Sequence, residues 1–234
     1  MHAVIINGSP RVKQFSNTDK IISKFAEGFC RDGNTYELYS ISDRREWDDA
    51  RKAYYNNFNI IIALPLYVEC VPGLLMEFLE TLTPKNEYTQ ISYILQGGFA
   101  EGSQLRCGQD YMKILTKELG CSYGGTLVKG DNFYIRFADE RERERRTGIY
   151  KEMGAVFSRD GDFFSDDCIK FTGPEVFSLP IRLMLGLMFK TLAKGLAEKT
   201  AAGLGCTKPI DCKPYIKNPL PEEMPTAEGI GCRI

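Results

Sequence analysis

The chain has 234 residues, of which 43% are hydrophobic and 26% are charged, and this composition is typical of a globular protein with one sizeable core. Its formal net charge of -1 gives no general attraction to nucleic acid or to anionic lipid. The sequence has no apolar run of membrane-spanning length and no leader of the kind found in signal peptides. We therefore expect a cytoplasmic protein without a nucleic-acid partner.

The eight cysteines are scattered along the chain and form no C-x-x-C pair. This spacing argues against a zinc ribbon, and in a chain of this length it also argues against a scaffold held by disulfides. We therefore expect no metal site. Cys206, Cys212 and Cys232 are candidates for metal or redox chemistry, but their spacing matches no known motif and favours structural or incidental roles.

The first segment has the pattern of a strand, a turn and a capped helix. Residues 3–6 are apolar and mostly β-branched, as in a strand buried on both faces, and residues 7–10 are turn formers. Residues 16–18 then offer N-cap side chains to a helix whose apolar residues recur at helical spacing from Ile21 to Phe29. The N–H groups and the dipole at such a helix end, with hydroxyls in the loop, favour a bound phosphate.

A purely structural interpretation of this segment is also open, because turn residues before a capped helix occur in most α/β proteins. The segment matches neither G-x-G-x-x-G nor G-x-x-x-x-G-K-[ST], so the dinucleotide fingerprint and the Walker loop are both absent from it. The phosphate hypothesis therefore depends on the motifs that follow.

The next elements alternate between strands and helices. Further strands are expected at residues 34–41, 59–64, 90–95 and 122–128. Helices are expected at residues 46–55, 74–82, 103–119 and 140–157, the third closed by Gly120 and the last carrying a Glu/Arg run that we interpret as a solvated face. This alternation predicts a doubly wound parallel sheet with right-handed crossovers.

Ligands of such sheets bind beyond the carboxyl ends of the strands, where the loops after strands one, three and four would meet. Gly97 and Gly98 would let the backbone approach a ligand closely, because neither has a side chain. Pro65 and Tyr67 would supply a rigid turn and a flat face. Each also has a structural interpretation, since Pro65 could only end its strand and Tyr67 could be a surface aromatic residue.

Taken together, these motifs resemble the flavodoxin-like NADPH-dependent FMN reductases and quinone reductases. The matching residues are 8–11 with 16–18, then 65–67 with 71–73 and 78–79, and then 96–98. The resemblance covers about residues 3–160. It implies a five-stranded parallel sheet with the strand order 2-1-3-4-5, bound FMN, and NADPH or NADH as the hydride donor for a small acceptor such as a quinone or free flavin.

The resemblance also assigns residues to the parts of the flavin. Those implied for the FMN phosphate are Ser9, Arg11, Ser16, Asn17 and Thr18. Those implied for the ribityl chain and the ring are Pro65, Leu66, Tyr67 and Val68. Those implied for the pyrimidine end are Gln96, Gly97, Gly98 and Phe99, whose backbone N–H groups would stabilise the reduced flavin.

No catalytic side chain is expected, because bound FMN would carry the chemistry and the sole histidine, His2, precedes the first strand. The chain departs from the family at Glu69 and Cys70, where relatives usually have a small residue and an aromatic one. Cys70 stands alone, so we expect no iron–sulfur cluster. It could be a redox-active thiol, although a lone cysteine is more often a small packed residue.

Residues 171–234 leave the pattern, so we expect a flavodoxin-like domain at residues 1–170 and a C-terminal extension. Residues 173–199 predict a helix, with a possible break at Pro180, that has one polar stripe and a wide apolar face. We expect that face to pack on the sheet domain or on a second subunit, as in a homodimer, and a membrane surface is the less favoured alternative. From residue 207 the prolines predict an extended strap.

Two other functions remain open at this stage. One is an electron carrier of flavodoxin type without NAD(P)H turnover of its own, although the near-neutral charge counts against it. The other is a flavin-free interaction module whose C-terminal helix binds a partner. The sequence shows no convincing 2′-phosphate site, so it does not distinguish NADH from NADPH.

Overall fold

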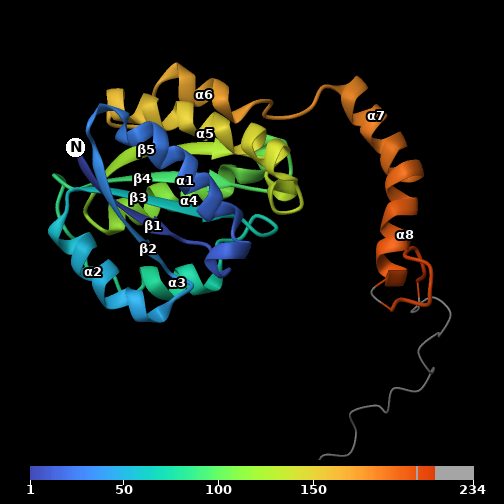
Figure 1. The fold of residues 1–234 in the computed structure, drawn as a ribbon, viewed down its shortest axis with the longest axis horizontal. Helices are drawn as coiled ribbons and strands as arrows, with labels where there is room; N and C mark the ends of the chain where they lie inside the picture. The colour runs from blue at the N-terminus through green and yellow to red at the C-terminus, as the bar shows by residue number, and fades with distance from the viewer. Residues whose placement is uncertain (204, 214–234) are drawn as a thin grey trace, which may run out of the picture. The chain divides into compact units, whose positions relative to one another are not determined.

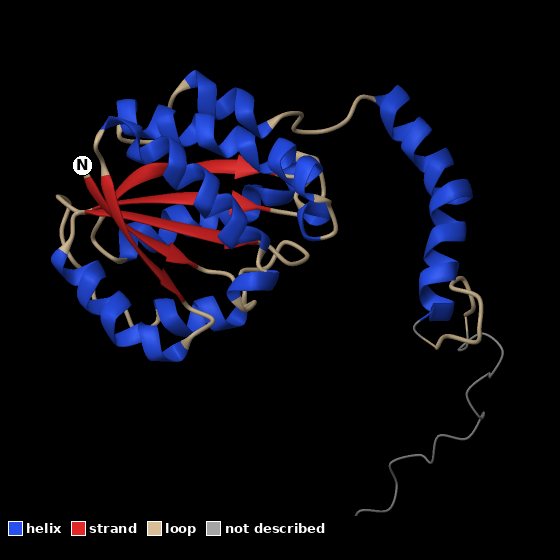
Figure 2. Ribbon diagram, in the orientation of Figure 1, coloured by secondary structure: helices blue, strands red, loops and turns tan. Residues whose placement is uncertain are grey.

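The computed structural model describes residues 1–203 and 205–213, and these divide between two compact units, Met1–Phe177 and Ser178–Ile234. The first unit contains a five-stranded parallel sheet in the order β2-β1-β3-β4-β5 (Figures 1 and 2). The predicted fold class and strand order are therefore confirmed.

The strands of the sheet are β1 (His2–Asn7), β2 (Thr35–Ser40), β3 (Asn59–Pro65), β4 (Gln90–Gln96) and β5 (Ser122–Lys129). The helices of the first unit are α1 (Asn17–Phe29), α2 (Trp47–Asn56), α3 (Gly73–Leu79), α4 (Arg106–Glu118), α5 (Glu140–Asp160) and α6 (Asp166–Thr172). The second unit contains α7 (Leu179–Met188), a π-helical turn (Phe189–Ala193) and α8 (Lys194–Gly203).

The sheet has a hydrophobic core on each face because alternate residues of its central strands point to opposite sides. Val4 and Ile6 of β1 pack with residues of α2, α3 and α4. Ala3 and Ile5 of the same strand pack with residues of α1, α5 and α6 on the other face. The two layers of helices are visible on either side of the sheet in Figure 1.

Helices α1 and α5 approach each other so closely that two glycines are needed between them. A Cβ atom at Gly28 would lie 1.8 Å from the carbonyl oxygen of Lys151, and one at Gly154 would lie 2.0 Å from that of Phe25. No real Cβ atom makes contacts this short with backbone. The glycines therefore fix the spacing of the helix that begins at the predicted phosphate loop and the helix that follows β5.

The predicted helix at residues 173–199 is wrong at its start. Helix α6, which the sequence pattern did not predict, ends at Gly173, where the backbone has a positive φ of 83° that interrupts the helix. The next helix begins at Leu179 with Ser178 as N-cap. Pro180 therefore lies in the first helical turn, where proline is tolerated, and does not break the helix.

Residues 173–177 belong to the first unit through contacts with the start of α4. The N–H groups of Gly102 and Ser103 donate to the carbonyls of Pro174 and Glu175 at 2.9 and 3.1 Å, and Arg106 pairs with the Glu175 carboxylate. The first compact unit consequently extends to Phe177, beyond the expected boundary at residue 170.

The second unit is helical and carries several exposed apolar side chains, among them Leu179, Leu183 and Met184. Lys194 pairs with Asp211 at 2.8 Å and ties the segment after α8 back to that helix. The described residues include no helix with the length and apolarity that crossing a membrane requires. Most of the predicted strap, residues 214–234 with Cys232, lies outside the described residues.

Candidate functional site at the carboxyl edge of the sheet

The loops singled out in the sequence lie at one edge of the sheet, beyond the arrowheads in Figure 2. Hydrogen bonds between backbone groups connect each loop to its neighbour. The N–H of Gly8 donates to Ala63 at 2.7 Å, and the N–H of Leu66 donates to Gln96 at 2.8 Å. The N–H of Gly97 donates to Lys129 at 3.1 Å. The three motifs are therefore brought together as the fold class predicts.

The first loop is arranged to receive an anion. Ser16 is the N-cap of α1, as predicted, and its hydroxyl accepts the N–H of Asp19 at 3.2 Å. Within the described chain, the N–H groups of Asn17 and Thr18 have no acceptor. The Ser9 hydroxyl accepts the N–H of Arg11 at 3.3 Å and keeps its own proton available as a donor. These N–H and O–H groups form the donor set that a phosphate requires.

Basic side chains surround this loop. Arg11 and Lys13 have no carboxylate partner among the described residues. Lys20 donates to the carbonyls of Gln14 and Ser16, at 3.3 and 3.2 Å, behind the loop. Burial, followed by the nearby Arg143 guanidinium, lowers the pKa of Lys20. A bound phosphate would relieve this repulsion between cations, so the electrostatics of the loop also fit an anion.

The second loop contains a tight turn with an unfavourable backbone. Tyr67 and Cys70 exchange two backbone hydrogen bonds of 2.9 and 3.1 Å, with Val68 and Glu69 between them at φ values of 49° and 65°. Side chains with a Cβ atom rarely adopt such positive φ values, and a β-branched valine does so least readily. The Arg11 guanidinium lies 6.0 Å from the Tyr67 ring centroid, so the phosphate loop and this turn are neighbours.

The side chains implied for the ring segment do not all reach the loop surface. Pro65 ends β3 opposite Gln96. Leu66 is buried against the first turn of α4, where a Cβ atom at Gly108 would lie 2.6 Å from it, so it can offer a ligand only its backbone. Tyr67 and Val68 are exposed. The assignment of Leu66 to the flavin site therefore stays a prediction, and it concerns the backbone of this residue.

The third loop has fewer free donors than the resemblance implies. Gln96 is buried, and its side-chain amide donates to the Thr18 hydroxyl at 3.3 Å. The N–H of Gly97 is bonded to Lys129, which leaves the N–H groups of Gly98 and Phe99 without an acceptor in the described chain. Only these two of the four expected groups are available to a ligand.

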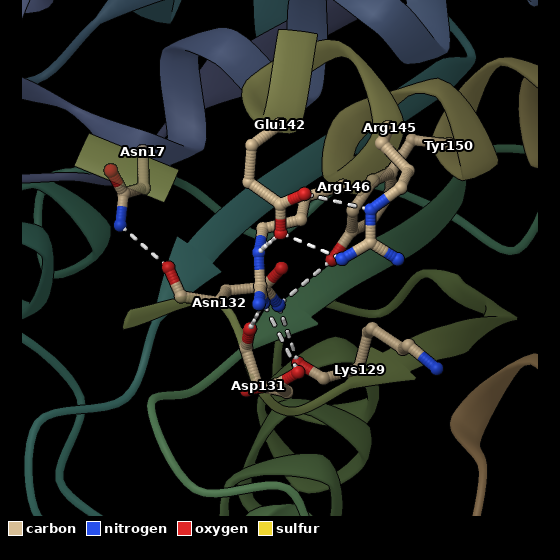
Figure 3. Close-up of polar contacts among 8 residues, drawn as sticks. All are labelled: Asn17, Lys129, Asp131, Asn132, Glu142, Arg145, Arg146 and Tyr150. Atoms are coloured by element: carbon tan, nitrogen blue, oxygen red, sulfur yellow. Dashed lines mark hydrogen bonds and ion pairs between the residues drawn. The ribbon is translucent and has the colours of Figure 1, made fainter. Parts of the chain in front are cut away.

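The loop after β5 is the part of the site that the sequence analysis missed. The Asn132 amide donates to the Lys129 carbonyl and to the Tyr150 hydroxyl, each at 2.9 Å (Figure 3). Its N–H donates to Gly97 at 3.0 Å, and its carbonyl accepts the Asn17 amide at 2.8 Å. Asn132 therefore connects the phosphate loop, the third loop and α5.

Charged side chains of α5 hold the same loop in place, so the Glu/Arg run is more than a solvated face. Arg143 donates to the carbonyls of Ile135 and Ala138 at 3.4 and 2.7 Å. Arg146 pairs with Asp131 and with Glu142 (Figure 3). Both arginines fix backbone that precedes their own helix.

Exposed aromatic rings flank this loop. The four large aromatic side chains exposed here are Phe99, Phe133, Tyr134 and Phe137. The Arg136 guanidinium lies 5.3 and 4.2 Å from the ring centroids of Phe133 and Phe137. A Cβ atom at Gly98 would be 3.6 Å from Phe133, so the rings adjoin the third loop. A flat apolar ligand could stack on this rim.

Replacing Asp19 by asparagine should stabilise the protein near neutral pH. Burial raises the pKa of Asp19 above its ordinary value, and Lys13 and Lys20 only partly offset this. A raised pKa in the folded state means that stability falls as pH rises above the value of the unfolded chain. The variant should therefore gain about 2 °C in Tm at pH 7 and nothing at pH 3. A Tm gain of the same size at both pH values would contradict this account.

Comparisons with known proteins agree with the fold. No family model matches the sequence, and no curated protein matches it significantly. Solved structures do match. An FMN-dependent NADH-azoreductase from Bacillus anthracis in complex with FMN has a TM-score of 0.51 and 13% identity, over 68% of this chain and 100% of that chain. An NAD(P)H:quinone oxidoreductase from Methanothermobacter marburgensis has a TM-score of 0.51 and 14% identity, over 67% and 96%.

An NADH:FMN oxidoreductase in its apo form also matches, with a TM-score of 0.51 and 15% identity over 74% of this chain and 96% of that chain. At such identities the likeness establishes the fold. The fold of this chain is the flavodoxin-like fold that the resemblance implied. The matching structures include a quinone reductase and an FMN reductase, the two kinds of enzyme that the sequence motifs resemble.

Proposed function

We propose that the chain is an FMN-dependent oxidoreductase that takes a hydride from NADPH or NADH and reduces a small acceptor such as a quinone or free flavin. The observation that supports this most directly is the anion-binding loop at the start of α1. It joins unsatisfied N–H groups, hydroxyls and basic side chains at the carboxyl edge of a flavodoxin-like sheet. The names of the matching structures, which include FMN-dependent and NAD(P)H-dependent enzymes, support the same class.

The residues fit FMN in three places. The donors at Ser9, Asn17 and Thr18 would hold the phosphate, with Arg11 and Ser16 completing the loop. Tyr67 and Val68 would line the flavin from the turn after β3. The N–H groups of Gly98 and Phe99 would donate to the polar edge of the ring, where negative charge is best stabilised by fixed dipoles. When bound, FMN would supply the hydride-accepting chemistry.

We assign no side chain as a catalytic acid or base. His2 begins β1 at the amino edge of the sheet, opposite the candidate site, and its ring contacts the Thr35 hydroxyl at 2.8 Å. The protein's contribution would be to bind the flavin, to orient it and to leave the exposed rim of aromatic rings open to the second substrate.

The experiment that tests this function is an anaerobic titration of the FMN-reconstituted protein with NADPH and then NADH, followed by visible absorption. Rapid loss of the flavin absorption with either nucleotide is the expected result. Retained flavin that stays oxidised would favour the electron carrier. Complete loss of FMN on gel filtration would contradict the phosphate assignment and favour the flavin-free interaction module.

We also propose that the protein is a homodimer in which the second unit contributes apolar contacts. Leu179 and Leu183 are each 66% exposed, and an apolar helix face of this kind is stabilised by burial. The molar mass of the full chain, measured by light scattering after gel filtration, should be twice 26.5 kDa. A monomer that binds anionic vesicles would instead favour the membrane-surface alternative.

A further inference from the structure

Two cysteines meet beside the candidate site without belonging to its anion-binding or ring-binding groups. Cys70 closes the turn after β3, and Cys107 is the second residue of α4. The Cys107 thiol donates to the carbonyl oxygen of Glu69 at 3.5 Å. Peptide geometry places the Cys70 Cα atom about 3 Å from that same oxygen. Cys107 Sγ and Cys70 Cα are thus no more than about 6.5 Å apart.

A disulfide requires a closer approach than this upper limit guarantees. Bridged cysteines usually have their Cα atoms about 4.4–6.8 Å apart, and where the separation is larger the backbone has to move before the bond can form. Both thiols are free and both residues are exposed, so a small oxidant can reach either one. Cys121 and Cys168, in contrast, are held in half-buried and buried positions.

The two backbones that carry these thiols differ in how easily they move. Leu66 packs directly against Gly108, so the beginning of α4 is fixed on the end of β3. The turn itself has Val68 and Glu69 at positive φ and is exposed. Non-glycine residues at positive φ are strained, so a movement of this turn that changes these φ values can release strain. The turn is therefore the partner that would adjust.

We propose that Cys70 and Cys107 form a reversible dithiol–disulfide pair that controls the turn at residues 67–70. Oxidation by a low-molecular-weight disulfide proceeds in two exchanges. One protein thiolate attacks the small disulfide, forms a mixed disulfide and releases one small thiol. The second protein thiolate then displaces the other small thiol. The protein loses two electrons and two protons, and the small disulfide is reduced to two thiols.

The consequence of this bond for the flavin rests on the proposed function. Cys70 is hydrogen-bonded to Tyr67 through both backbone groups, so drawing Cys70 toward α4 also displaces Tyr67. That displacement would change the position of the Tyr67 ring relative to Arg11, which now lies 6.0 Å from its centroid. The oxidised protein should therefore bind FMN at least fivefold more weakly than the reduced protein.

The first test detects the bond itself in FMN-free protein. The full chain with Cys206, Cys212 and Cys232 replaced by serine is incubated with oxidised glutathione, digested without reduction and analysed by mass spectrometry. We expect a peptide pair linked through Cys70 and Cys107 that dithiothreitol separates. Glutathione adducts alone, or linkage to another cysteine, would overturn the proposal.

The second test measures the FMN dissociation constant of the same protein before and after oxidation. Cys107→Ser keeps a donor for the Glu69 carbonyl and is the matched control, so its FMN affinity should not respond to the oxidant. Equal FMN affinities of the oxidised and reduced parent would overturn the proposal that the disulfide controls the turn at residues 67–70. Failure of the reduced protein to bind FMN would contradict the proposed function instead. The first test detects the disulfide without FMN, so failure of the proposed function can be told apart from failure of the disulfide proposal.

Discussion

Gly154→Ala is expected to lower the free energy of unfolding by about 3 kcal/mol or more, because it places a methyl group inside the backbone of α1. The added Cβ atom would lie 2.0 Å from the Phe25 carbonyl oxygen and 2.8 Å from the Phe29 nitrogen. Neither atom belongs to a flexible side chain, so the two helices have to separate. Urea denaturation followed by circular dichroism measures the change.

Gly148→Ala is the matched control within the same helix. A Cβ atom at Gly148 would meet nothing within 4 Å. Alanine is favoured over glycine inside a helix by about 1 kcal/mol, so this variant should be as stable as the parent or slightly more so. If both substitutions lowered the free energy of unfolding equally, the close approach of α1 and α5 would not be the cause.

Separation of α1 and α5 should also weaken the candidate site. Helix α1 begins with the donors of the phosphate loop, and α5 carries Tyr150, which bonds to Asn132. The glycine variant should therefore bind FMN less well under conditions in which it is still folded. The spacing of α1 and α5 therefore affects both the free energy of unfolding and the geometry of the candidate site.

Local patterns were enough to predict the sheet and the first loop. The strand at the N-terminus is buried along nearly its whole length, as its apolar β-branched residues indicate. Ser16 caps the following helix, and Gly120 has a positive φ of 67° after α4, both as expected. These features depend on residues that are adjacent in sequence, and for that reason a single sequence reveals them.

The parts that were missed depend on contacts between distant residues. Asn132 sits in a stretch of turn formers with no further signal of its own, and its contact with Asn17 spans 115 residues. The predicted start of α7 was too early because Val176 and Phe177 extend the apolar pattern of the helix toward Gly173, while the backbone at that glycine leaves the helical region. Arg143 belongs to a run of charges that predicts an exposed helix face, and the sequence does not indicate its two backbone carbonyl partners, Ile135 and Ala138.

Asn132→Ala should reduce FMN affinity at least tenfold, because its side chain fixes the loop between the phosphate and ring ends of the proposed site. The substitution leaves the buried Tyr150 hydroxyl without its amide donor, while the Lys129 carbonyl loses one donor and keeps the N–H of Gly97. An unsatisfied buried group costs about 1–3 kcal/mol, so unfolding should also become easier. Fluorescence titration of FMN gives the affinity, and urea denaturation gives the stability.

Tyr150→Phe separates these two effects, since it removes the hydroxyl and leaves the Asn132 amide bonded to the Lys129 carbonyl at 2.9 Å. It should retain most of the FMN affinity, because the side-chain bond to Lys129, which Asn132→Ala removes, still fixes the loop. An Asn132→Ala variant that is destabilised but binds FMN normally would remove Asn132 from the site. The loop after β5 would then serve the fold alone, and flavin binding would depend on the three loops that the sequence predicts.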